Sequence, residues 1–233
     1  LLSNLYLFNM KKLLALLVWP SLLLAQAPTP CELLIKNGRI VDGSGNSWYR
    51  GNLVINNGKI VSIFRSAVIS NEENKWQPAR IIDAQDKIIA PGFIDVHTHI
   101  EGDEKRDPEA KSFIYDGVTT CITGNCGLSQ VDVNRYYSFI DSLRMSINVT
   151  MLIGHNDIRR AVMGRANRDA TDQEQLQMEQ LVEKAMRDGA VGLSTGLIYI
   201  PGTFSKTPEI VELAKKAAAF GGVYATHMRD EGD

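Results

Sequence analysis

Apolar and polar positions form two different patterns along this chain, one before and one after about residue 90. In residues 28–90, short apolar runs alternate with turn-forming residues, which is the pattern of β-hairpins. Leu33–Val41 predicts a strand, a turn and a strand, and Leu53–Ile63 predicts a hairpin whose turn is Asn57-Gly58. Further short strands are predicted over residues 80–89. We therefore expect a small antiparallel β unit, which these residues do not complete into a domain by themselves.

In residues 91–233, apolar strand-like runs alternate with amphipathic helices. The predicted strands are Phe93–Val96, Val118–Thr123, Val149–Ile153, Ala190–Leu193 and Val223–Thr226. The predicted helices begin at Asp107, Val131, Thr171 and Thr207, and the third opens with a Thr-x-x-Glu capping box. Strands that alternate with helices imply a parallel sheet with right-handed crossovers.

The length of this second region limits the choice of α/β fold. No Gly-x-Gly-x-x-Gly follows the first strand, so a nucleotide-binding doubly wound sheet has no support. A (β/α)8 TIM-type barrel usually needs about 250 residues. Only 141 of the 233 residues remain from Phe93 onward. We therefore expect the first five β/α units of an incomplete barrel, over residues 91–233.

Composition narrows the class of partner. The chain is 44% hydrophobic and 22% charged, with a net charge of −2, which suits one or two globular domains. It has no basic stripe with interleaved aromatic residues, so we expect no nucleic-acid partner. Three cysteines are too few for a disulfide scaffold. Cys121 and Cys126 could pair in an oxidising compartment, and one of them could instead be a metal thiolate.

The N-terminal residues have the pattern of a secretory signal peptide. Met10 is followed by two lysines, the apolar run Leu13–Leu24 is too short to span a membrane comfortably, and Ala25-Gln26-Ala27 is a cleavage pattern. We expect cleavage after Ala27, with a retained N-terminal anchor as the alternative. Residues 1–9 precede this Met and have the character of an over-extended reading frame. The mature protein is then periplasmic or secreted, with no membrane association.

Candidate metal ligands recur at the ends of the predicted strands, where the functional side chains of a barrel lie. His97 and His99 follow the first strand with a spacing of two, which places both on one face. Cys126 follows the second strand and His227 ends the fifth. Imidazole and thiolate are typical zinc ligands, so the pattern predicts a site for one or two metal ions. His155, after the third strand, is either a pocket residue or a structural histidine.

A metal-activated water at such a site would suit hydrolysis of an unactivated amide. A general base is still required, and none of the carboxylates at these strand ends is an obvious candidate. Asp95 lies before His97 on the same face of the strand, where it could equally orient an imidazole from the outer shell. Cys121 alternates with apolar positions of its strand, which favours a packing role.

These residues give the chain a specific likeness. It resembles the amidohydrolase superfamily and, within it, the D-aminoacylase (N-acyl-D-amino-acid deacylase) family. The resemblance covers about residues 33–233 and is carried by six stretches in a fixed order. These are Gly92–His99, Gly117–Thr120, Gly124–Gly127, Val162–Gly164, Gly192–Tyr199 and Tyr224–Gly232.

The resemblance implies a barrel flanked by a small β-sandwich, to which the N-terminal strands contribute. It also implies zinc-dependent hydrolysis of N-acyl-D-amino acids, small-molecule substrates, to a carboxylate and a D-amino acid. By this analogy His97 and His99 serve one metal position, Cys126 binds or bridges, and His227 helps hold the tighter zinc. Tyr199 would lie near the bound substrate.

The departures from the family pattern are also informative. Related amidohydrolases bridge two metals with a carboxylated lysine on the fourth strand, and residues 190–199 contain no lysine, which favours Cys126 in that role. The family's later histidine ligand and its general acid/base aspartate would both lie beyond Asp233. We therefore expect an N-terminal fragment that is inactive alone. A cyclic-amide or dipeptide hydrolase and a non-catalytic metal-binding fragment are the alternatives. The sequence does not fix the oligomeric state.

Overall fold

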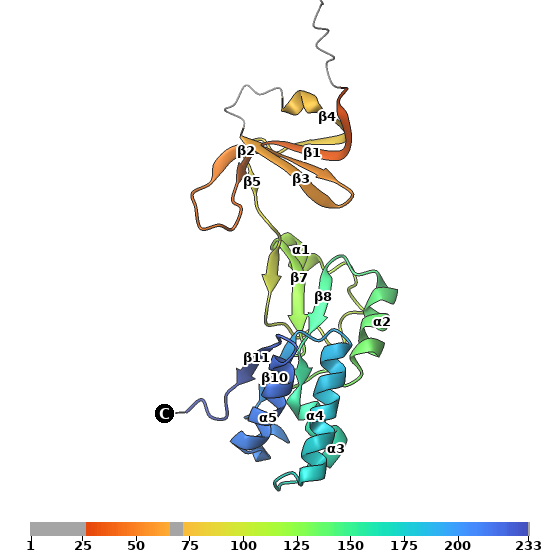
Figure 1. Cartoon of the computed structure of the whole chain (residues 1–233), viewed down its shortest axis with the longest axis vertical. Coiled ribbons are helices and arrows are strands. Elements are labelled where there is room, and N and C mark those ends of the chain that lie inside the picture. Colours follow the sequence, from red (N-terminus) through yellow and green to blue (C-terminus); the bar gives the residue numbers. More distant parts are fainter. Residues whose placement is uncertain (1–26, 66–71, 233) are drawn as a thin grey trace, which may run out of the picture. The chain divides into compact units, whose positions relative to one another are not determined.

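The computed structural model describes residues 27–65 and 72–232, and it divides into two compact units between Pro91 and Gly92 (Figure 1). The predicted signal peptide, residues 1–27, lies outside the described residues except for Ala27. Across the described part of the chain, no helix combines the length and the apolar character needed to cross a membrane.

The first unit is one five-stranded sheet with the order β3-β2-β1-β4 and β5 beside β1. Its elements are β1 (Thr29–Ile40), β2 (Tyr49–Asn56), β3 (Lys59–Arg65), the short 3-10 helix η1 (Glu73–Lys75), β4 (Trp76–Asp83) and β5 (Ile88–Ile89). β2 is antiparallel to β1 and β3, whereas β4 and β5 run parallel to β1. The sheet is therefore mixed, and the prediction of a purely antiparallel unit is wrong. Cys31, Leu34 and Val54 form its small core.

Two Asn-Gly pairs in this unit behave differently. Asn57 and Gly58 adopt φ values of 50° and 66° and form the predicted hairpin turn between β2 and β3. Asn37, with φ 59°, instead produces a register shift within β1, where its N–H donates to Oδ1 of Asn52 at 3.0 Å. β1 is thus one long strand with a bulge, and the predicted turn at this point is wrong.

The second unit contains the five predicted strand regions in sequence order, and its strands pair as two three-stranded parallel sheets where the sequence predicted one. Its elements are β6 (Phe93–Asp95), α1 (Lys111–Tyr115), β7 (Val118–Thr123), α2 (Val133–Leu143), β8 (Asn148–Met151), β9 (Ile153–Gly154), α3 (His155–Met163), α4 (Asp172–Arg187), β10 (Gly192–Gly196), η2 (Gly202–Phe204), α5 (Thr207–Ala218) and β11 (Val223–His227). β6, β7 and β8 pair in parallel, as do β9, β10 and β11. Only Leu152 separates β8 from β9, so the two continue one strand position.

The helices follow their sequence signals to different degrees. α4 has the predicted capping box, in which the Thr171 hydroxyl accepts from the Glu174 N–H and the Glu174 carboxylate accepts from the Thr171 N–H. α1 begins at Lys111, later than the predicted start at Asp107, and ends before Gly117, whose φ is 79°. α3 was not predicted from the hydropathy pattern. Figure 1 shows α3, α4 and α5 grouped beside β10.

The core of the second unit lies between these helices and the strands. One face of α4 is buried, with Met178 and Val182 fully inaccessible. They pack in one cluster with Ile153 of β9, Leu193 of β10 and Leu213 of α5. Burying side chains of this size stabilises a fold by about 1.5–3 kcal/mol each. This core holds β9 and β10 against the helices, and Tyr199 of the candidate site follows β10.

Candidate functional site

All five of the predicted site residues line one hollow of about 510 Å³ in the second unit. Its lining comprises His97, His99, Cys126, Tyr199, Thr226, His227, Met228 and Glu231. These residues follow or end β6, β7, β10 and β11, which lie far apart in sequence. The parallel arrangement brings their carboxyl ends to the same side, which is where functional groups of α/β folds gather.

His97 and His99 lie in the loop just after β6, which ends at Asp95. Both are exposed, and their ring centroids are 5.4 Å apart at an interplanar angle of 69°. Thr98 between them is buried, and both its N–H and its Oγ1 donate to the carbonyl of Ile122, at 3.1 and 2.9 Å. Anchoring the middle residue to β7 turns the two imidazoles together toward the pocket.

Cys126 lies in the loop after β7 with an unusual backbone conformation. Its φ is 55°, in the left-handed region that residues other than glycine seldom adopt. Gly124 and Gly127 on either side also have positive φ. A Cβ at Gly124 would lie 2.1 Å from the carbonyl oxygen of Leu152, so only glycine allows this close approach. Left-handed residues of this kind gather at functional sites, where the surrounding structure holds them in place.

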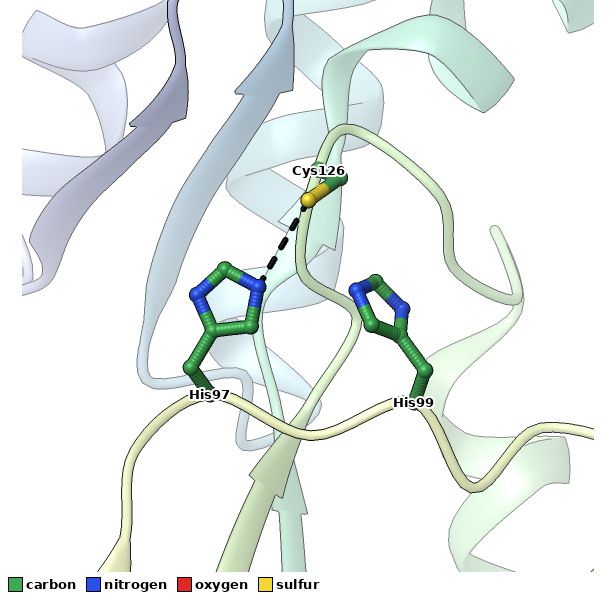
Figure 2. Close-up of side chains that lie close together, drawn as sticks. All are labelled: His97, His99 and Cys126. Atoms are coloured by element: carbon green, nitrogen blue, oxygen red, sulfur yellow. Dashed lines mark hydrogen bonds between the residues drawn. The ribbon is translucent and has the colours of Figure 1, made fainter.

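The three side chains nearest one another form a potential ligand cluster. The potential ligand atoms of His97, His99 and Cys126 all lie within 4.8 Å of one another, and Sγ of Cys126 is 3.6 Å from Nε2 of His97 (Figure 2). Burial raises the pKa of the Cys126 thiol, and the nearby negative charge of Glu101 raises it further. The thiol is therefore protonated at neutral pH unless a cation replaces its proton.

His227, at the end of β11, occupies another part of the same hollow. Its ring meets that of Tyr199 edge to face, with centroids 4.9 Å apart and an interplanar angle of 85°. Its Nε2 lies 2.6 Å from Oε1 of Glu231. The sequence did not single out Glu231. Glu231 lies four residues after His227, and the contact forms because the chain beyond β11 brings its carboxylate back to the ring.

The structure also shows the surroundings of Asp95 and His155, whose roles the sequence left open. The Asp95 carboxylate accepts a hydrogen bond from the backbone N–H of His97 at 3.2 Å, so it supports the loop and not an imidazole ring. His155 does not line the pocket. It is fully buried at the start of α3, where its Nε2 lies 2.8 Å from Oε1 of Glu209, and Arg159 binds the other oxygen of that carboxylate.

Charge compensation explains why this buried group is tolerated. Burial alone would raise the pKa of Glu209, but hydrogen bonds from His155 and Arg159, together with the charges of these partners, outweigh it and lower that pKa. His155 thus has the structural role that the sequence left open, with a carboxylate as its partner.

The donor set of the candidate site fits a metal ion chemically. Two imidazoles and one thiol are the nitrogen and sulfur ligands that zinc favours, and they converge from two loops on one point. A third imidazole, that of His227, shares the same hollow. A site with this composition that is open to solvent leaves room for a substrate, as catalytic metal sites do and closed structural sites do not.

Comparison with known proteins supports this picture. The family model described as "Amidohydrolase family" matches residues 80–227. The chain is 35% identical over 88% of its length to D-aminoacylase of Alcaligenes xylosoxydans xylosoxydans, and 31% identical over 87% to N-acyl-D-glutamate deacylase of the same organism. It spans about half the length of these relatives, 46% and 44% respectively.

Solved structures give the same result. The crystal structure of N-acyl-D-glutamate deacylase from Bordetella bronchiseptica, complexed with zinc and a phosphonate inhibitor that mimics the reaction's tetrahedral intermediate, superposes with a TM-score of 0.79. It is 33% identical and the match covers 88% of this chain and 46% of that one. A D-aminoacylase structure described for its binuclear metal centre is 30% identical, with a TM-score of 0.71 and the same coverage. The chain therefore belongs to the amidohydrolase family.

Proposed function

We propose that the whole protein is a zinc-dependent hydrolase that cleaves the amide bond of N-acyl-D-amino acids, giving a carboxylate and a free D-amino acid. The observation that carries this proposal is the convergence of His97, His99 and Cys126 within 4.8 Å, beside His227 and Tyr199 in one hollow. The relatives named D-aminoacylase and N-acyl-D-glutamate deacylase support the choice of substrate class.

The residues of the site divide into two groups. His97, His99 and Cys126 would hold a metal ion, with His227 completing the shell of the same ion or of a second one. Bound zinc would supply Lewis-acid polarisation of the amide carbonyl and a water of lowered pKa. Tyr199, with its ring against that of His227, would contact the substrate. One or two ions are compatible with this set, as the binuclear centre named for D-aminoacylase suggests.

The same proposal extends to the architecture. The parallel strands of residues 91–233 would be the first five β/α units of a (β/α)8 barrel, and residues 28–90 would be the N-terminal part of a β-sandwich domain. The likeness to the Bordetella deacylase supports both assignments. A crystal structure of the whole protein would test them: β6 and β11 should each pair with a further barrel strand, and open edges there would contradict the barrel.

The activity is tested with matched enantiomers. The whole protein, loaded with zinc, is incubated with N-acetyl-D- and N-acetyl-L-amino acids of several side chains, and release of free amine is measured. We expect turnover of the D enantiomers only. Equal turnover of both, or hydrolysis of only cyclic amides or dipeptides in the same panel, would overturn the substrate assignment while leaving the metal site intact.

The metal site is tested separately through a pair of cysteines. We expect Cys126→Ala to lower the zinc content of the purified protein sharply, because it removes the only sulfur among the cluster's potential ligands. Cys31→Ala is the control, since Cys31 is likewise a free cysteine but is buried in the first unit. Unchanged zinc stoichiometry in Cys126→Ala, measured by atomic emission, would rule out its ligand role.

We also propose that the protein is exported. The support is the pattern of residues 10–27, a basic start, an apolar run and a small-x-small end. Expression of the gene in a Gram-negative host, followed by mass spectrometry of the purified protein, should give a mature N-terminus at Pro28. A product that retains the apolar run and stays with the membrane fraction would instead indicate an N-terminal anchor.

A further inference from the structure

The candidate ligands come from two loops, and their convergence depends on how those loops are joined. His97 and His99 lie in the loop after β6, and Cys126 lies in the loop after β7. The hydrogen bonds that pair β6 with β7 end at Asp95 and Cys121, before either ligand is reached. Beyond that point, one backbone hydrogen bond, from the Thr98 N–H to the Ile122 carbonyl, joins the two segments, and the side chains of Glu101 and Asn125 make further connections.

Glu101 makes the first connection. It follows His99 by two residues, yet its Oε1 accepts hydrogen bonds from the loop of the other ligand. The donors are the backbone N–H of Gly124, at 2.8 Å, and the hydroxyl of Thr123. Thr123 is fully buried, so this is an interior contact and not a chance surface pairing. Because Oε1 already accepts two hydrogen bonds, the Glu101 carboxylate is held against the loop that carries Cys126.

Asn125 makes the second connection, in the opposite direction. Its side chain is 1% exposed, and its Nδ2 donates to the carbonyl of Ile122 at 2.9 Å and to that of Thr98 at 3.4 Å. Thr98 is the residue between the two histidines. Asn125 therefore ties the residue next to Cys126 to the centre of the histidine pair.

We infer that Glu101 and Asn125 are positioning residues, which lock the two loops together so that the thiol and the imidazoles converge before a metal ion binds. The backbone of Cys126 gives this role a physical reason. A non-glycine residue at φ 55° relaxes unless its neighbours fix it. Glu101 holds Gly124, two residues before Cys126, and the side chain of Asn125, the residue just before it, is tied to Thr98 and Ile122. The inference rests on the metal site proposed above.

The test uses variants of Glu101 in the whole protein, prepared without metal. Affinity for zinc is measured by competition with a chromophoric chelator, and the thiolate-to-cobalt charge-transfer band is recorded after cobalt substitution. We expect Glu101→Ala to weaken zinc binding by about 10–100-fold, the usual cost of losing an outer-shell partner, and to reduce the cobalt–thiolate band. Glu101→Gln, which keeps an acceptor oxygen, should restore both readouts.

Two further variants keep the test decisive. Thr123→Val removes one donor at nearly constant volume and should weaken zinc binding in the same direction, even if Glu101→Ala folds poorly. Glu109→Ala, an exposed carboxylate of the same unit, should change nothing. Parent-like affinity and cobalt spectrum in both Glu101→Ala and Thr123→Val would overturn the positioning role.

The remaining outcomes separate this inference from the proposed function. Failure of Gln to rescue Glu101→Ala would contradict positioning, because it would mean that the negative charge itself is required, as for a direct ligand. A parent protein that binds no zinc and shows no cobalt–thiolate band would remove the metal site, and this inference with it.

Discussion

In the second unit, histidines follow strands β6 and β9, and they differ in burial and in partners. His155 begins α3 after β9, is fully buried, and shares the Glu209 carboxylate with Arg159. His97 and His99 follow β6, are exposed, and face a thiol across an open hollow. The Nε2 of His155 is paired with a buried carboxylate, whereas His97 and His99 are exposed.

The comparison shows that a position at a strand end is not sufficient evidence of a chemical role. His155 and the pair His97 and His99 differ in the groups that contact their imidazoles. At β9 a helix starts at once and carries the histidine into the interior, where a glutamate of α5 meets it. At β6 the chain continues as a loop whose middle residue is anchored, so the histidines stay at the surface of the pocket. Substitutions at Glu209 should therefore change the free energy of unfolding, and substitutions at His97 should change the affinity for zinc.

The largest effect should come from Glu209→Ala. It leaves Arg159, which is fully buried, without its carboxylate partner, and removal of one partner from a buried ion pair typically costs 3–5 kcal/mol. We expect a loss of about that size in the free energy of unfolding, measured by urea denaturation. Glu212→Ala, an exposed residue of the same helix, should change it by less than about 0.5 kcal/mol. Equal losses in the two variants would contradict the structural role of the cluster.

His97→Ala should show the opposite pattern. Because the side chain is exposed, the free energy of unfolding of the metal-free chain should change by less than about 0.5 kcal/mol. Zinc affinity should fall by more than the roughly 10–100-fold expected for an outer-shell residue, since a direct ligand is lost. Chelator competition and urea denaturation on one preparation give both values. A variant that is destabilised but binds zinc normally would reverse the comparison.

These contrasts also show what could be read from the sequence. The five parallel strands and α4 were predictable because their apolar positions repeat with a clear period and their caps are standard. α3 was not, because three of the four residues that it buries are polar: His155, Asn156 and Arg159 are all fully inaccessible. Hydropathy cannot identify a helix whose inward face carries charges that are neutralised by a residue 50 positions later in the chain.

The candidate site was easier to predict than its supports. Residue types that bind metals can be recognised one by one at strand ends, so His97, His99, Cys126 and His227 could be proposed without coordinates, and the structure places them around one hollow. The residues that hold the loops could not be, since Glu101 and Asn125 act through contacts between segments.

Likewise, the dipeptide at Asn37 and that at Asn57 have the same turn signal. Only the pairing of β1 with β2 shows that the first is a bulge.

A smaller effect is expected when the pH is lowered. The pKa of Glu209 is held below its ordinary value by His155 and Arg159, so the ionised form stabilises the fold. This contribution is fully present above the pKa of an unfolded glutamate, about 4.3, and is lost as the pH falls through the lower, folded value. Urea denaturation at successive pH values below about 4.3 should show the stability of the parent approaching that of Glu209→Gln. Parallel curves for the two proteins would contradict the assignment.

The smallest effect should come from Asp95→Asn. The carboxylate accepts one hydrogen bond from the His97 backbone N–H at 3.2 Å, and the amide oxygen of asparagine can accept the same bond. We therefore expect the free energy of unfolding to change by less than about 0.5 kcal/mol, and zinc affinity to fall far less than in Glu101→Ala. Both are measured as for His97→Ala. If Asp95→Asn instead weakened zinc binding by about 10–100-fold, the carboxylate would be orienting an imidazole in the metal-bound protein, and the loop-anchoring role assigned to it here would be wrong.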